Sequence, residues 1–349
     1  MIHVRNAWHV AAWSCDIVAE KPSSISILGE PVVIWRSASG AVRALEDRCV
    51  HRLAPLSLGR CEGENLRCMY HGLLFGPDGG VVEIPGQDLI PAKARARSYP
   101  VADRHDWIWV WMGDPALADE ALIPPAVGTS DPDWILGHGY LDYAAEARLI
   151  CDNLLDFSHL TYVHAQSFQA GPEFAKHQPR ITMRDRGVRL SRWLPAAVGN
   201  WRNPHDVPVE MYQTYDFLVP GVLLMWSANY PAGTAERLGD AAPAMSDALS
   251  GLNFTSQAVT ATGAGTARYF FSWGPHRQHG DAAKRDMMMA MAGQAFAEDK
   301  TMIEAQQHVI AATPDPQIMP TAHDRAVTLY NRLAERLACD NPSELESAA

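Results

Sequence analysis

The sequence predicts an α+β protein of two domains: a small all-β domain, then a larger domain that combines an antiparallel sheet with helices. Three observations support this prediction. The chain has 349 residues, which exceeds one typical domain. Its first third consists of short strand-like segments between turns. The remainder contains longer strand-like runs followed by a long segment rich in helix-forming residues.

The first domain is predicted from β-branched and aromatic segments separated by Gly and Pro. These segments are ISILG at 25–29, VVIWR at 32–36, AVRAL at 41–45 and WIWVW at 107–111. Residues 113–134 then contain Asp114-Pro115, Pro124-Pro125 and Asp131-Pro132, and such steps favour turns over regular structure. We therefore expect a linker in this region, with domains at residues 1–115 and 116–349.

The second domain begins with a predicted helix at 149–164, where apolar residues recur at helical spacing. A long helix is predicted over about 281–310 and a final one over 324–338, while the Gly/Ala-rich residues 231–251 are expected to form a surface loop. The strand-like runs between them are 180–193, 210–218, 222–229, 252–260 and 267–273.

The amino-acid composition indicates which binding partners and which cellular compartment are expected for the protein. The net charge of −11 argues against nucleic acid as a partner, because phosphate binding requires a basic surface. The apolar stretches at 107–112 and 217–226 are too short to span a membrane, and the N-terminus lacks the pattern of a signal peptide. Six scattered cysteines are typical of a reducing compartment. We expect a soluble, cytoplasmic protein with no membrane or nucleic-acid partner.

Two cysteine–histidine pairs form the clearest motif of the chain. Cys49-Val50-His51 is followed after sixteen residues by Cys68-Met69-Tyr70-His71. Two Cys and two His are also a zinc-finger ligand set, but fingers usually group like ligands together. One Cys and one His on each loop let one iron take both thiolates and the other both imidazoles, as in a Rieske [2Fe–2S] cluster. Cys61 lies nearby without a histidine at matching spacing.

A second group of potential metal ligands lies in the predicted helix at 149–164. At about 100° per residue, His159 would lie about 60° to one side of Asp156 and His164 about 80° to the other. A distant carboxylate could complete a 2-His-1-carboxylate triad for non-heme Fe(II). Two satisfied histidines and capping acids such as Asp152 and Asp156 are the alternative explanation.

Several segments together resemble the large (alpha) subunit of the Rieske non-heme iron aromatic oxygenases. The resemblance covers nearly the whole chain and is greatest to the subgroup of vanillate O-demethylases, dicamba demethylase and toluenesulfonate methyl-monooxygenase. The segments are RNAWHVAAW at 5–13, CVHRLAPLSLGR at 49–60, CMYHGLLF at 68–75, IPGQ at 84–87, WVWMGDP at 109–115, DNLLDFSHLTYVH at 152–164 and EDKTMIEAQ at 298–306.

The resemblance implies two cofactors in each subunit, and a catalytic domain of the helix-grip type. In the implied [2Fe–2S] Rieske cluster, one iron is held by Cys49 and Cys68 and the other by His51 and His71. The implied ligands of the mononuclear non-heme Fe(II) are His159, His164 and Asp299.

The implied third iron ligand, Asp299, comes from the resemblance, because spacing alone does not choose it over Glu298 or Glu304. The resemblance also places Asn153 near the iron. It assigns Asp156 to a bridge between a mononuclear-site histidine and a cluster histidine, His71, of a neighbouring subunit. That bridge implies a ring-shaped homotrimer.

The implied function is that of the oxygenase component of a multicomponent monooxygenase. It would use O2 and two electrons to O-demethylate or hydroxylate a methyl group on a small, vanillate-like aromatic substrate. The sequence shows no G-x-G-x-x-G after a strand and no flavin or plant-ferredoxin motif, so a separate NAD(P)H-dependent reductase, with or without a ferredoxin, is expected to supply the electrons. The alternatives are a ring cis-dihydroxylating dioxygenase, a pure electron-transfer protein and a zinc-stabilised binding module.

The substrate pocket is expected mostly within residues 165–280. Arg192, Arg202 and His276 could meet an acidic substituent of the substrate, although a surface role also fits each of them. The aromatic and apolar candidates are Phe157, Phe168, Tyr212, Tyr215, Met225, Trp226, Phe271 and Trp273.

Overall fold

The computed structural model describes residues 3–168, 174–196 and 206–339. The chain divides into two compact units, whose bounds are drawn from contacts between Cα atoms. The first comprises the described residues up to Ile123 together with Thr260–Ala264 and residues 338–339. The second comprises the described residues of Pro124–Val259 and Gly265–Leu337. An all-β unit followed by a sheet-and-helix unit confirms the predicted fold class.

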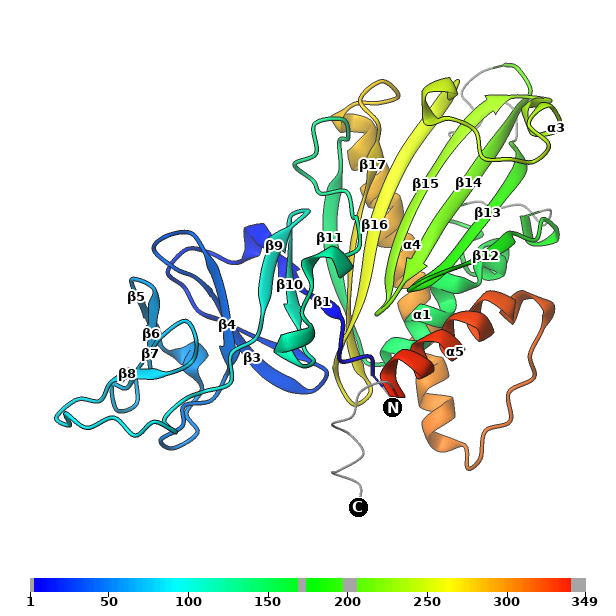
Figure 1. The fold of residues 1–349 in the computed structure, drawn as a ribbon. Helices are drawn as coiled ribbons and strands as arrows, with labels where there is room; N and C mark the ends of the chain where they lie inside the picture. The colour runs from blue at the N-terminus through cyan, green and yellow to red at the C-terminus, as the bar shows by residue number, and fades with distance from the viewer. Residues whose placement is uncertain (1–2, 169–173, 197–205, 340–349) are drawn as a thin grey trace. The chain divides into compact units, whose positions relative to one another are not determined.

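The first unit consists of three small antiparallel sheets (Figure 1). One sheet has the order β1-β10-β9, with β1 at Trp8–Trp13, β9 at Val101–Arg104 and β10 at Trp107–Trp111. The second has the order β2-β3-β4, at Ser23–Ile27, Glu30–Arg36 and Val42–Glu46. The third has the order β5-β6-β7-β8, at Arg60–Glu62, Asn65–Arg67, Leu74–Phe75 and Val81–Glu83.

The second unit contains a seven-stranded antiparallel sheet of order β11-β17-β16-β15-β14-β13-β12 (Figure 1). Its long hairpins place alternate side chains of each strand on one face, which faces the helices of the site. The strands are β11 Gly137–Tyr143, β12 Arg180–Arg184, β13 Gly187–Ala196, β14 Val209–Leu218, β15 Val222–Pro231, β16 Ser250–Gly263 and β17 Thr266–Pro275.

Helix α4 lies against β17 and β11, and the helices α1 and α2 pack against α4 (Figure 1). Within α4 the buried residues include Met288, Ala292, Ala295, Asp299 and Ile303, spaced at three or four residues, so one stripe of the helix faces the sheet. The helices are α1 Ala147–Leu155, α2 Leu160–Val163, α3 Thr234–Arg237, α4 Ala282–Ala312 and α5 Arg325–Cys339.

The predicted single helix at 149–164 is wrong. Helix α1 ends at Leu155, and Asp156 has an extended backbone with φ −124° and ψ 97°. A 3-10 turn at Phe157–His159 and the short α2 follow. The break arises because the Asp156 carboxylate accepts hydrogen bonds from the Ser158 N–H (2.8 Å) and hydroxyl (3.0 Å), capping the new turn instead of continuing the helix. The 180–193 run is likewise divided, into β12 and β13.

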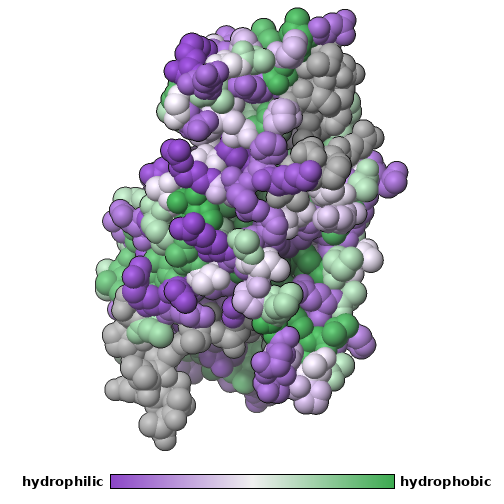
Figure 2. Space-filling view, turned by 90° about the vertical axis from the view of Figure 1, so that its right-hand side faces the viewer, coloured by the Kyte–Doolittle hydropathy of each residue, from purple (hydrophilic) through white to green (hydrophobic). Residues whose placement is uncertain are grey.

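Among the described residues, no helix is long and apolar enough to cross a membrane. On the face shown in Figure 2, hydrophilic side chains are spread among hydrophobic ones.

Candidate metal centres and substrate cavity

The two cysteine–histidine loops of the first unit have the same backbone geometry. The N–H of Cys49 donates to Ala54 O (2.8 Å), and that of Cys68 donates to Leu73 O (2.9 Å). Four residues after each cysteine, the N–H of Leu53 or Gly72 donates back to the cysteine carbonyl, and both of these residues have positive φ. Each loop therefore folds around its own cysteine, and the two form a matched pair.

The loops separate the two kinds of ligand. Cys49 and Cys68 lie in the apolar core of this unit with Leu56, Leu66 and Phe75 around them. The two thiols are close enough that burial and then the Cys68 thiol raise the pKa of Cys49. His51 and His71 are exposed, and their ring centroids are 4.5 Å apart. Two buried sulfurs beside two paired imidazoles fit a cluster with one iron on each side.

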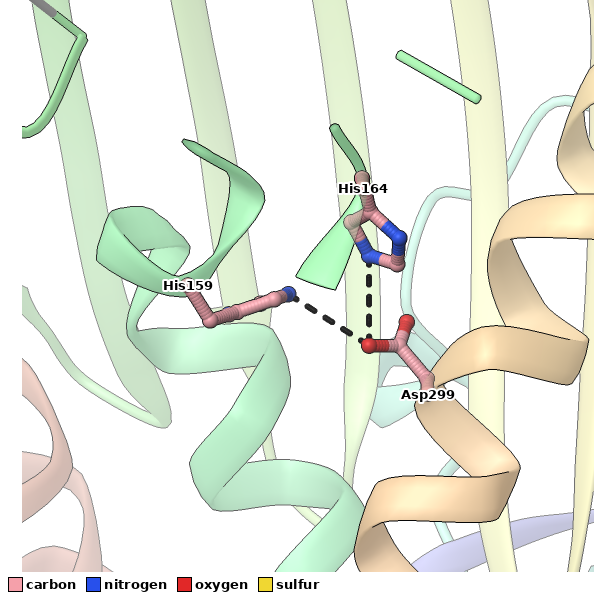
Figure 3. A group of neighbouring side chains, drawn as sticks. All are labelled: His159, His164 and Asp299. Atoms are coloured by element: carbon pink, nitrogen blue, oxygen red, sulfur yellow. Dashed lines mark ion pairs between the residues drawn. The ribbon is translucent and has the colours of Figure 1, made fainter. Parts of the chain in front are cut away.

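A second group of potential metal ligands forms in the second unit, from two segments that are distant in sequence. His159 ends the 3-10 turn, His164 follows α2, and Asp299 lies on the buried stripe of α4 (Figure 3). One ligand atom from each lies within 4.8 Å of the others. Asp299 Oδ1 is 3.5 Å from His159 Nε2 and 3.2 Å from His164 Nε2. Two imidazoles and one carboxylate converging in this way fit a divalent iron with open positions.

The outer nitrogen of each imidazole has its own partner. His159 Nδ1 lies 2.6 Å from the main-chain carbonyl of Asp156, and His164 Nδ1 lies 2.9 Å from Glu298 Oε2. Each Nδ1 must donate to these oxygens, so the Nε2 lone pair of each ring faces the convergence point. Both rings are thereby held in the tautomer that a metal needs.

The electrostatics of the two histidines differ. Burial lowers the pKa of His159, and the Asp299 charge only partly offsets this. Burial also acts to lower the pKa of His164, but hydrogen bonds and charge from Asp299 and Glu298 outweigh it and raise that pKa. For Glu298, hydrogen bonds from His164, Ser167 and Gln294 outweigh burial and keep the carboxyl pKa below its ordinary value.

Sequence reasoning missed the role of Glu298 and Ser167. Glu298 accepts a hydrogen bond from His164 and another from the Ser167 hydroxyl at 2.7 Å, so it orients a candidate ligand without being at the convergence point itself. Glu304, which spacing had also left open as the third ligand, accepts a hydrogen bond from the Ala144 N–H instead. The periodicity of the α4 stripe could have separated these residues, since Asp299 falls on it between Ala295 and Ile303.

Asn153 contacts the His159, His164 and Asp299 group through its side chain, whereas Asp156 contacts it through its main-chain carbonyl. Asn153 Nδ2 is 3.2 Å from Asp299 Oδ1 and 3.5 Å from His159 Nε2. Asp156 contacts His159 through its carbonyl, while its carboxylate binds the N–H and hydroxyl of Ser158. Within one chain, the link from Asp156 to the histidine therefore runs through the main chain.

The group opens onto a cavity between the sheet and the helices, which we call the main cavity. Its volume is about 1030 Å³, including the space at its opening to solvent. Four of the predicted pocket residues line it: Phe157, Phe168, Met225 and Trp273. Four other predicted residues are not among its lining residues: Tyr212, Tyr215, Trp226 and Phe271.

Two of the three predicted basic residues, Arg192 and His276, do not line the main cavity. Arg192 lines a second cavity of about 790 Å³, together with Asp156 and Tyr215. His276 packs against the ring of Trp134, with ring centroids 5.1 Å apart. Arg202 lies outside the described residues.

Comparison with known proteins agrees with both halves of this architecture. Residues 7–100 match the Rieske [2Fe-2S] domain, and residues 143–339 match the vanillate O-demethylase oxygenase C-terminal domain. The toluene-4-sulfonate monooxygenase system iron-sulfur subunit of Comamonas testosteroni is 36% identical over 96% of both chains. A vanillate O-demethylase oxygenase subunit from a Pseudomonas species is 33% identical over 99% of this chain and 97% of its own.

Solved structures give the same result. The crystal structure of dicamba monooxygenase bound to 3,6-dichlorosalicylic acid has a TM-score of 0.87 and 28% sequence identity, with both chains covered completely. A Rieske-type unit joined to a sheet-and-helix unit with a His/His/Asp group defines an oxygenase subunit. The chain belongs to the family of Rieske non-heme iron oxygenases that includes the vanillate O-demethylase oxygenase subunits. It is an oxidoreductase whose cofactors are a [2Fe–2S] cluster and a mononuclear iron.

Proposed function

We propose that this chain is the oxygenase component of a monooxygenase system that oxidises a methyl or methoxy group on a small substituted aromatic molecule. One observation carries the proposal: the His159, His164 and Asp299 ligand atoms converge at the wall of the main cavity. Around them the cavity is lined by Leu154, Phe157, Leu160, Phe168, Met288 and Phe296. An apolar wall beside an iron with open positions suits an aromatic substrate.

We assign the ligands residue by residue. Cys49 and Cys68 would hold one cluster iron, His51 and His71 the other, and His159, His164 and Asp299 the mononuclear iron. The adjacent buried thiols, the paired exposed imidazoles and the convergent Nε2 atoms support this assignment. Asn153 would stand next to the iron, where its amide already contacts Asp299 and His159.

The overall reaction for a methoxylated substrate consumes O2, two electrons and two protons. One oxygen atom enters the methyl C–H bond, and the other leaves as water. The resulting hemiacetal separates into the phenol and formaldehyde. Oxidation of an aryl methyl group in place of a methoxy group would stop at the benzylic alcohol. Iron in this ligand set, supplied with electrons by the cluster, provides the activation of O2.

The residues of this chain would hold and orient the substrate in that reaction. The apolar wall holds the ring by contact and excludes water from the reacting carbon. Glu298 and the Asp156 carbonyl keep both imidazoles aligned throughout turnover, because their hydrogen bonds fix the ring orientation.

Electrons would come from partners outside this chain. The relatives are named as components or subunits of larger systems, which supports a separate NAD(P)H-dependent reductase, with or without a ferredoxin. We place the chain in the cytoplasm, and assign residues 1–115 to the electron-accepting domain and residues 116–349 to the catalytic domain.

We further propose a ring-shaped homotrimer in which Asp156 links the iron site of one subunit to His71 of the next. A protein surface around the cluster is supported by exposed apolar side chains on the two loops, including Leu53, Met69 and Tyr70. In this arrangement the Asp156 carbonyl would hold His159 while its carboxylate holds His71 of the neighbouring subunit, and this link would shorten the electron path between the two metals.

The test uses purified protein loaded with Fe(II), a compatible reductase and NADH. Methoxylated, methylated and sulfonated aromatics are screened for NADH and O2 consumption that depends on the aromatic. Formaldehyde release identifies demethylation, and a benzylic alcohol identifies methyl hydroxylation. A colourless protein without cluster iron, or oxygen use unaffected by every aromatic, would contradict the proposal.

A further inference from the structure

Among the described residues, three methionines line the main cavity together with the proposed iron ligands: Met211, Met225 and Met288. Their side chains differ in how much surface they leave accessible. Met211 is 8% exposed and Met288 is 1% exposed, whereas Met225 is half-buried. Met288 also precedes Asp299 by eleven residues of α4, about 16 Å along the helix axis. Of the three methionines, Met225 therefore leaves the most surface accessible.

On one side, Met225 is next to a residue that contacts the segment carrying His159. Met225 on β15 is directly opposite Tyr215 on β14, and such residues have Cβ atoms about 5 Å apart. The Tyr215 ring stacks on the Phe157 ring, with centroids 4.8 Å apart. Phe157 begins the 3-10 turn that ends at His159, and the centroids of these two rings are 6.4 Å apart. The sheet below this turn therefore includes Met225.

On the other side, Met225 is linked to the helix that carries the proposed carboxylate ligand. Its directly opposed neighbour on β16 is Thr255, which also lines the main cavity. Thr255 accepts a hydrogen bond from Gln257 Nε2 at 3.0 Å, and Gln257 Oε1 accepts one from the Tyr269 hydroxyl at 2.7 Å. The Tyr269 ring lies 5.1 Å from the ring of Phe296, which is one helical turn before the proposed carboxylate ligand on α4.

Met225 thus lies on the sheet side of the main cavity, between neighbours that are linked to both segments supplying iron ligands. Its side chain lines the same cavity as the ligand atoms. A methionine side chain is unbranched, with three rotatable bonds and a polarizable sulfur, so the sulfur can reach into the cavity. That sulfur takes up one oxygen atom to become a sulfoxide. Oxidation of the surrounding aliphatic side chains requires the cleavage of a C–H bond, so the Met225 sulfur is the more readily oxygenated group.

We propose that Met225 is an internal oxygen acceptor: when no aromatic substrate occupies the main cavity, the iron site transfers one oxygen atom of O2 to the Met225 sulfur. The proposal rests on the proposed function, because it uses the same iron site, O2 and reductase-supplied electrons. The sulfur lone pair forms the S–O bond and the O–O bond breaks. The second oxygen atom leaves as water with two electrons and two protons. The product is methionine sulfoxide, and no C–H bond is broken.

An aromatic substrate and Met225 compete for the same oxygen atom in this scheme. A ring bound in the cavity shields the Met225 sulfur, because Met225 and the iron ligands line the same space. Without a ring, the sulfoxide places a polar, chiral group in a wall that otherwise includes Leu154, Phe157 and Leu160. Turnover without substrate therefore weakens the later binding of an aromatic molecule. Methionine sulfoxide reductases reverse this modification.

Peroxide released into solution is the rival source of methionine oxidation. A diffusible oxidant reaches methionines according to their exposure. Met302 is 57% exposed and Met319 is 82% exposed, and neither is among the residues that line the main cavity. These two methionines therefore report oxidation from solution, whereas Met225 reports oxidation from the iron site.

The experiment uses the protein loaded with cluster and Fe(II), supplied with a compatible reductase, NADH, ¹⁸O2 and catalase, without any aromatic. Mass spectrometry then measures the labelled oxygen of each methionine-containing peptide and of the intact chain. The variants are Met225→Leu, which removes the sulfur at nearly constant volume, the matched control Met288→Leu, and Asp299→Ala, which is expected to lack the mononuclear iron. Thermal melting confirms that each variant is folded, and the wild-type peptide map requires no variant.

The wild-type Met225 peptide is expected to gain one labelled oxygen, at least about fivefold more often than the Met302 and Met319 peptides. The intact Met288→Leu chain should gain this oxygen as the wild type does, and the Met225→Leu chain should not. Asp299→Ala should show no labelling of Met225. An aromatic that supports coupled turnover should lower the labelling of Met225 in the wild type.

The inference would be overturned by a wild-type protein without label at Met225, by equal label at Met302 and Met319, or by unchanged label at Met225 in Asp299→Ala. It would also be overturned if a coupled aromatic left the label unchanged. These results are separable from a failure of the proposed function. Coupled oxidation of an aromatic without label at Met225 would remove the inference and keep the function. Iron-dependent label at Met225, in a protein that oxidises no aromatic, would do the reverse.

Discussion

Replacing Glu298 should weaken iron binding even though Glu298 is not itself a proposed ligand. Its Oε2 accepts hydrogen bonds from His164 Nδ1 at 2.9 Å and from the Ser167 hydroxyl at 2.7 Å. The carboxylate thus fixes the tautomer and the orientation of His164, and it increases the basicity of the Nε2 atom that faces the iron site. Loss of such a partner commonly costs ten- to hundredfold in metal affinity.

For Glu298→Gln, the most conservative substitution, the expected loss of Fe(II) affinity lies near the lower end of that range. The Glu298 side chain is 25% exposed, so solvent screens part of its charge. Glu298→Gln keeps an oxygen that can accept from His164 and loses only the charge, and we expect about tenfold weaker Fe(II) binding. Glu298→Leu removes the acceptor as well and should approach a hundredfold loss.

The assay is anaerobic competition between the protein and a chelator for Fe(II), with the visible absorption of the cluster as an internal measure of an intact first unit. Glu304→Gln is the matched control, because Glu304 lies on the same helix but accepts from the Ala144 N–H. If Glu298→Leu kept Fe(II) within twofold of the wild-type affinity, the orienting role assigned to Glu298 would be wrong.

Three other predictions concern different parts of the chain. Asp156→Asn should leave both metals bound, because the Asp156 carbonyl that holds His159 is unchanged, yet nearly abolish substrate-coupled turnover; wild-type coupled rates would refute the bridge. Asp299→Ala should lose the mononuclear iron but keep the cluster, as metal analysis and visible absorption would show; retention of that iron would exclude Asp299 as a ligand. Burial lowers the pKa of His9 from 6.5 to about 4, so the unfolded chain takes up a proton first as the pH falls. Stability should therefore be full above pH 6.5 and decline toward pH 4 by up to about 3 kcal/mol, and denaturant unfolding of His9→Gln should lack this decline.

The structure brings together His159, His164 and Asp299, which the sequence analysis had named, but on a different local structure from the one predicted. His159 and His164 were recognisable as candidate ligands, but their expected positions around Asp156 were those of one continuous helix. Asp156 instead leaves the helix and caps the following turn, which moves His159 and His164 onto a turn and a helix end. Asx side chains compete with the helical backbone in this way, and helical periodicity alone does not detect it.

The choice of Asp299 as the third candidate ligand shows what helical periodicity can and cannot decide. Spacing within 298–304 left Glu298, Asp299 and Glu304 open. The structure separates them by the helix face on which each lies, since only Asp299 is on the buried stripe of α4. The roles of Glu298 and Ser167 could not be predicted, because their contact joins segments 131 residues apart.

A row of polar side chains that crosses four strands of the sheet could also not be predicted from the sequence. The row is formed by Arg192, Gln213, Ser227 and Asn253. Arg192 was identified as a possible partner of an acidic substituent, but its contact with Gln213 depends on the register of β13 and β14. Sheet register brings together residues from four strands, and a shift of one residue would move each side chain to the other face. Such a row is visible only in the folded sheet.

The most direct test of the central claim follows the fate of both atoms of O2. The iron-loaded protein, a reductase and NADH are supplied with ¹⁸O2 and 4-methylbenzoate, and the products are analysed by mass spectrometry. A monooxygenase of the proposed kind will yield 4-(hydroxymethyl)benzoate with one labelled oxygen. A ring cis-diol that carries two labelled oxygens would contradict the account and establish dihydroxylation instead.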